Sequence, residues 1–100
     1  MSTDVLSLIP TANGDCQAAF AELGEANAEC LRIGTFMANH PHLSVGIESM
    51  LQHGYKTAHD GALATTAAGA IDWTNIIQWV ITNGPAIMQF IMQIVAMFGA

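Results

Sequence analysis

Positive charge is scarce in this sequence of 100 residues. Arg32 and Lys56 are the only cations beside eight acidic residues, and the formal net charge is −6. Nucleic-acid binding needs clustered Lys or Arg to neutralise phosphate, and docking onto anionic lipid uses polybasic segments. The composition therefore predicts no nucleic-acid partner and argues against electrostatic docking to a membrane.

Charge of either sign is missing from the end of the sequence. No charged side chain occurs from Trp73 to Ala100. Over the whole chain 52% of residues are apolar and 10% are charged, where typical soluble domains have about 25% charged residues. A helix that faces solvent normally carries a charged face. We therefore expect this segment to be buried in its own domain, in a partner or in lipid.

Cysteine is also rare, with Cys16 and Cys30 as the two examples. On one continuous helix they would be four turns and about 21 Å apart, beyond the reach of a disulfide. We expect two buried free thiols. The acidic start of the chain lacks the basic region of a secretory signal. This predicts cytoplasmic synthesis, with assembly into a particle or a membrane.

The first part of the chain predicts an arm and two Ala- and Gly-rich helices. Residues 1–14 are interpreted as an extended N-terminal arm. Apolar residues at a spacing near 3.5 predict one helix over 15–39, with Asn27 inside its apolar seam. Pro41 breaks this pattern, and a second helix is expected to end near Ala67. Together, 15–70 is predicted to be a helical hairpin.

Glycines recur within these two expected helices. Gly24 and Gly34 lie in the first, and Gly46, Gly54 and Gly61 are spaced along the second. Glycine weakens a helix by about 1 kcal/mol relative to Ala. The expected compensation is the close approach of a neighbouring helix.

The last part predicts two short helices. Asp72 is a favourable N-cap for a helix that ends at Asn83, and Gly84-Pro85 is a stop–start signal before a helix over 86–98. We expect 71–100 to form an apolar C-terminal helical hairpin. The overall prediction is an all-α fold of about four helices.

The residues that could act in catalysis or bind a metal do not form a recognisable motif. His40, His42, His53 and His59 lack the spacing of converging metal ligands, and Cys30 has no oxyanion motif near it. We therefore predict no enzyme activity, no catalytic residue, no metal site and no cofactor.

The apolar C-terminal segment is the candidate interface. Gln89 and Gln93 share a narrow stripe with Ala86 and Ala96. The stripe is either an assembly surface or the solvent-facing edge of the helix. The residues predicted to form the assembly or membrane interface are Trp73, Ile77, Trp79, Ile87, Gln89, Phe90, Ile91, Gln93, Ile94 and Phe98.

Two functions follow from these features. The first is a non-enzymatic structural subunit that self-assembles into a large homo-oligomer or particle. In composition the chain resembles subunits of homopolymers such as viral coat or shell components and filament proteins, although no motif carries this likeness. The alternative is a small membrane-inserting protein of the virion membrane, holin-like or pore-forming kind. Helix 86–98 would span about 20 Å, which is too short to cross a hydrocarbon core of about 30 Å alone. The expected partners are copies of the chain, a larger particle or a lipid bilayer.

Overall fold

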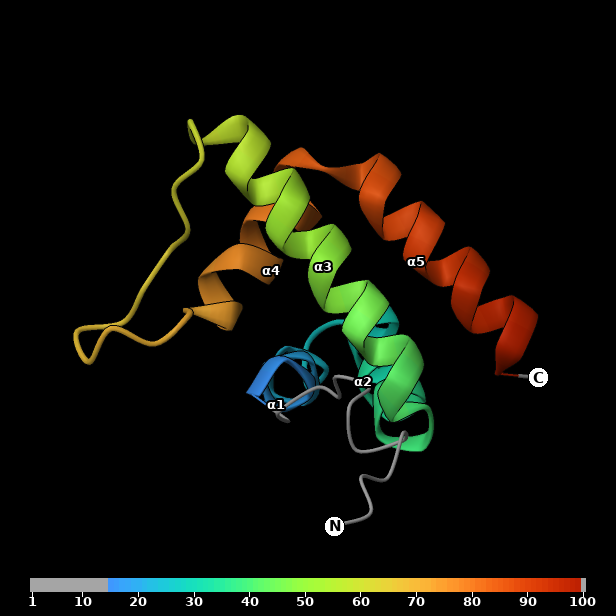
Figure 1. Cartoon of the computed structure of the whole chain (residues 1–100). Helices are drawn as coiled ribbons and strands as arrows, with labels where there is room; N and C mark the ends of the chain where they lie inside the picture. The colour runs from blue at the N-terminus through green and yellow to red at the C-terminus, as the bar shows by residue number, and fades with distance from the viewer. Residues whose placement is uncertain (1–14, 100) are drawn as a thin grey trace, which may run out of the picture.

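The computed structural model describes residues 15–99, which form five helices and no named strand (Figure 1). The helices are α1 (Asp15–Leu23), α2 (Ala28–Asn39), α3 (Pro41–Ala58), α4 (Trp73–Asn83) and α5 (Pro85–Phe98). The predicted all-α class is confirmed, with one helix more than the expected number of about four. The predicted arm 1–14 lies outside the described residues.

The helix expected over 15–39 is interrupted, so this prediction is wrong. α1 ends at Leu23 and α2 begins at Ala28. Asn27 is not part of a helical seam, because its side chain caps α2. Its Oδ1 atom accepts the backbone N–H groups of Glu29 at 2.9 Å and Cys30 at 3.2 Å. These bonds satisfy donors that a helix start leaves without partners.

The break lets α2 pack against α1, with glycine at the contacts. A Cβ atom on Gly24 would lie 2.9 Å from the Cα atom of Leu31, and one on Gly34 would lie 3.3 Å from the backbone nitrogen of Ala21. The predicted close approach is found at both glycines, but only Gly34 lies within a helix as expected, because Gly24 lies in the turn after α1. The single-helix geometry assumed for Cys16 and Cys30 is wrong, although both are free and buried as expected.

The second long helix also differs from the prediction, because α3 ends at Ala58 and not near Ala67. Asp60 and Gly61 take positive φ values of 55° and 85° and turn the chain out of the helix. The following loop swings away from the helices before α4 (Figure 1). An isolated antiparallel bridge between Thr65 and Ile71 closes this loop.

The local signals around α4 and α5 are confirmed. Asp72 caps α4 by accepting the Asn75 N–H at 3.2 Å, and Pro85 occupies the first turn of α5. The two helix axes differ in direction by 105°, so the pair forms a near right-angled bend and not an antiparallel hairpin. Among the described helices, none is long and apolar enough to cross a membrane, whereas α4 and α5 together meet the length and composition test as a bent pair.

One apolar core joins all five helices. α4 contacts α1, α3 and α5, and α2 contacts α5. The largest side chains that are almost completely buried come from every helix: Phe20, Ile33, Met37, Ile47, Leu51, Ile76, Ile77, Val80 and Ile91. The chain therefore buries part of its apolar C-terminal segment within its own fold, mainly through α4.

Candidate assembly surface

α5 is fixed by one apolar edge. Met88, Ile91 and Val95 are buried at the i, i+3, i+7 spacing of a helix face. They pack into the core, and α5 contacts α2, α3 and α4. Three neighbouring helices thus hold this helix in a defined orientation.

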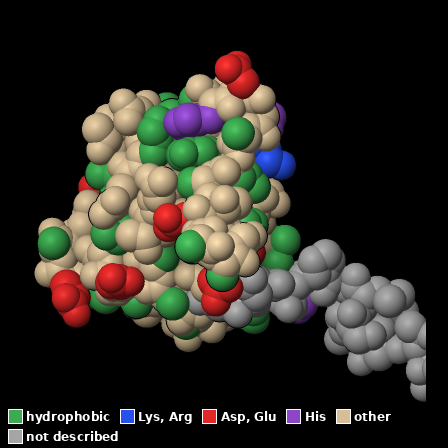
Figure 2. All heavy atoms as spheres, turned by 90° about the vertical axis from the view of Figure 1, so that its left-hand side faces the viewer, with side chains coloured by type: hydrophobic (Ala, Val, Ile, Leu, Met, Phe, Trp, Pro, Cys, Tyr) green, Lys and Arg blue, Asp and Glu red, His purple; other side chains and the backbone are tan. Residues whose placement is uncertain are grey.

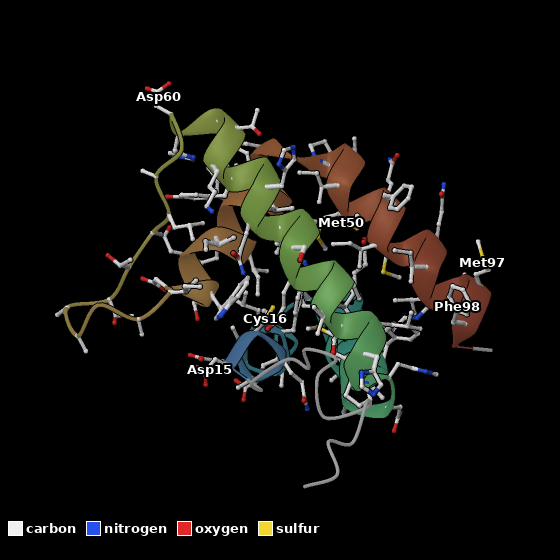
Figure 3. The ribbon with its side chains drawn as sticks, in the orientation of Figure 1. Asp15, Cys16, Met50, Asp60, Met97 and Phe98 are labelled. Atoms are coloured by element: carbon white, nitrogen blue, oxygen red, sulfur yellow. The ribbon has the colours of Figure 1, made fainter. Side chains whose placement is uncertain are left out.

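The opposite side of α5 faces solvent and carries no charge. We call it the α5 outer face, which comprises Ala86, Gln89, Phe90, Gln93, Ala96, Met97 and Phe98. The side chains of Phe90, Met97 and Phe98 are 54%, 71% and 52% exposed. Met97 and Phe98 lie on the last turn of α5 at the edge of the molecule (Figure 3). Exposed large apolar side chains grouped on one face mark an interaction surface more often than isolated ones do.

A furrow runs between α2 and this face. It consists of three adjoining hollows of about 190, 560 and 350 Å³, which follow both helices in the same direction. Glu29 and Gln89 line both the first and the second hollow, and Arg32 lines both the second and the third. The furrow therefore carries one anion and one cation, with the amides of Gln89 and Gln93 on the α5 side.

Apart from Glu29, which lines the furrow beside it, the acidic residues of the described fold lie away from the α5 outer face. Asp15, Glu22, Glu25 and Glu29 belong to α1, α2 and the turn between them, Glu48 to α3 and Asp60 to the following loop, and Asp72 directly precedes α4. Figure 2 shows acidic side chains spread over the side that carries the α3–α4 loop, opposite α5. The acidic residues of the described fold are thus spread over α1, α2, α3 and the segments between the helices, whereas α4 and α5 contain none.

The structure divides the ten predicted interface residues into three groups. Trp73, Ile77 and Ile91 are buried in the core. Trp79, Ile87 and Ile94 are half-buried and pack against it. Gln89, Phe90, Gln93 and Phe98 are exposed together on the α5 outer face. Only the last group is accessible to a partner without a change in the fold.

Three large exposed apolar residues of the described fold were not among the predicted interface residues: Leu31 and Met97, which lie on or beside the α5 outer face, and Leu43 on α3. Met97 follows Gln93 by one helical turn, so the spacing of the Gln89–Gln93 stripe could have identified it. Leu31 is 53% exposed beside the furrow. Leu31 does not fit the apolar spacing predicted for residues 15–39, and this departure could have identified it as exposed.

The histidines make local aromatic contacts. The ring of His59 stacks on Tyr55 with centroids 3.8 Å apart and meets the edge of Trp79 at 5.3 Å. His40 stacks on Phe36 at 4.4 Å. Within residues 15–99, no group of three or more His, Cys, Asp or Glu side chains is arranged to hold a metal ion.

Both thiols are electrostatically disfavoured as nucleophiles. Burial raises the pKa of Cys16, and the carboxylate of Glu48 raises it further. Burial also raises the pKa of Cys30, with a smaller contribution from Glu29. Since the thiolate is the reactive form, these environments keep both cysteines protonated and unreactive.

Comparison with known proteins gives no relative from which a role can be transferred. No protein-family model, curated protein or solved structure matches the chain.

Proposed function

We propose that this chain is a non-enzymatic structural subunit that self-assembles into a homo-oligomer or a larger particle through the α5 outer face. The observation that carries the proposal is the exposure of Phe90, Met97 and Phe98 on a helix without a charged residue. Burial of the exposed half of a Phe side chain contributes on the order of 1 kcal/mol. Several such side chains on one face favour association.

The charge distribution supports a copy of the same chain as the partner. Two copies of net charge −6 repel each other when their acidic surfaces meet. Contact through α5 brings together the helix that lacks charge. The adjoining furrow contributes Glu29 and Arg32, whose charges are opposite. Electrostatic repulsion between two copies is thus weakest when they meet at the α5 outer face.

Light scattering coupled to size-exclusion chromatography tests the proposal on the full chain without detergent. We expect particle masses that are multiples of 10.6 kDa and rise with protein concentration. A folded species of 10.6 kDa across the micromolar range would overturn the proposal.

Membrane association is the second candidate function, favoured by a different observation. α4 and α5 together have the length and composition of a bent membrane segment. An uncharged apolar face can also lie in the interface between lipid headgroups and hydrocarbon. Flotation of the full chain with phosphatidylcholine vesicles tests this function. Co-flotation of the wild type that is lost in Phe90→Gln supports it, and wild-type protein that stays at the bottom of the gradient contradicts it.

A further inference from the structure

Four exposed residues of α5 are arranged symmetrically about Ile91, at the middle of the helix. Gln89 and Gln93 lie at equal sequence distance on either side of Ile91, as do Ala86 and Ala96 further out. All four flanking residues are exposed, whereas Ile91 faces the core. These four residues therefore occur in the same order from either end of the helix, whereas Phe90, Met97 and Phe98 have no like counterpart across Ile91.

Such an order brings like side chains together in an antiparallel two-fold helix pair. In an isologous interface, residue i of one copy contacts residue j of the other, and j contacts i. We propose that α5 packs antiparallel against α5 of a second copy, with the two-fold axis on the outer side of α5 at the height of Ile91. Gln89 then faces Gln93 of the second copy, and Ala86 faces Ala96. This inference rests on the proposed self-assembly and adds the register in which α5 of one copy meets α5 of the other.

The chemistry of the face fits this register. Alanines at both ends of the contact allow the helix backbones to approach closely. Each glutamine amide has a donor and an acceptor, so facing amides can satisfy each other. Antiparallel pairing also places opposite ends of the two helix dipoles side by side.

Disulfide trapping tests the register directly. Gln89→Cys and Gln93→Cys are prepared separately, one of them isotope-labelled, and are mixed and oxidised. The wild-type chain is the blank, because Cys16 and Cys30 are buried. We expect mixed disulfides between the two variants to exceed those within either variant, since a disulfide needs Cα atoms within about 7 Å.

The outcomes separate this register from the proposed self-assembly. A predominance of disulfides between identical positions would overturn the antiparallel register and leave self-association standing. If light scattering shows a wild-type monomer, both the register and the proposed function fail. A wild type that assembles while neither variant forms disulfides locates the contact elsewhere and overturns this inference alone.

A charge pair gives an independent test. In the antiparallel register, Gln89→Glu with Gln93→Lys sets opposite charges face to face, whereas Gln89→Glu with Gln93→Glu sets like charges together. We expect the Glu–Lys variant to associate and the Glu–Glu variant to associate about tenfold or more weakly. Parallel pairing would bring identical residues together and impair both variants. Equal loss of association in the two variants would therefore overturn the register.

Discussion

Ile87 of α5 places its Cδ1 atom in the space that a Cβ atom on Gly54 of α3 would occupy. A side chain at Gly54 would therefore require the end of the Ile87 side chain to move. Gly46, on the same helix, has no atom within 4 Å of the equivalent position. The two glycines form a matched pair of sites on α3.

Gly54→Ala is expected to be less stable than Gly46→Ala. Ala favours a helix by about 1 kcal/mol at both positions, but at Gly54 alone the Cδ1 atom of Ile87 must move, which offsets part of this gain. Chemical denaturation monitored by circular dichroism measures the difference in the free energy of unfolding. Equal stabilisation by both substitutions would show that α5 does not pack closely on Gly54.

Asn27→Ala tests the break between α1 and α2. We expect a loss of about 1 kcal/mol in the free energy of unfolding, because the substitution removes the cap on α2. Asn27→Asp retains an acceptor and should remain close to the wild type. If 15–39 were one continuous helix, Asn27→Ala would instead raise the free energy of unfolding, because Ala favours a helix interior more than Asn does.

The carboxyl of Glu48 predicts a dependence of stability on pH. Burial raises its pKa, and nearby Asp15 raises it further. The folded state therefore holds this proton more tightly than the unfolded state, and the associated stability is present below about pH 4.3 and lost as the pH rises through the raised pKa. Glu48→Gln should melt at a higher temperature than the wild type near neutral pH, and the difference should shrink towards about pH 4.

Thermal melts over this pH range, with Glu22→Gln as an exposed control, check the prediction. A Glu48→Gln variant that is less stable than the wild type near neutral pH would show that the charged carboxylate is favoured in the fold.

Phe90→Gln should separate folding from association. The free energy of unfolding of the monomer should change by about 0.5 kcal/mol or less, because Phe90 is more than half exposed. Association should weaken, since the α5 outer face loses an apolar side chain. Leu43→Gln changes an exposed apolar residue on α3 and should leave association unchanged. Sedimentation velocity measures both variants, and equal association of Phe90→Gln and the wild type would remove Phe90 from the interface.

Local signals in the sequence were sufficient where one or two residues determine the conformation. Asp72 caps α4 and Pro85 begins α5 because an Asp acceptor and a fixed proline φ act at short range. The all-α class follows from the helical spacing of apolar residues along the chain. The turn after Leu23 was missed because Ala-rich apolar spacing continues across it, although Asn27 is a good capping residue.

The surface could be predicted only in part. A helix without charged residues has no distinct polar face. The sequence therefore did not determine which side of α5 faces solvent, the side with Gln89 and Phe90 or the side with Ile91. Burial of Ile91 results from contacts of α5 with α2, α3 and α4, which are separated from it in the sequence. For the same reason, the sequence could not show that Trp73 and Ile77 belong to the core.

Light scattering of the wild type beside Gln89→Glu with Gln93→Glu, near neutral pH and without detergent, tests the central claim most directly. The control is Ser49→Glu with Thr57→Glu, which adds equal charge at exposed positions of α3. We predict assembly of the wild type and the control, and a folded 10.6 kDa monomer for the α5 variant. Equal assembly of all three proteins, or a monomeric wild type, would contradict self-assembly through the α5 outer face.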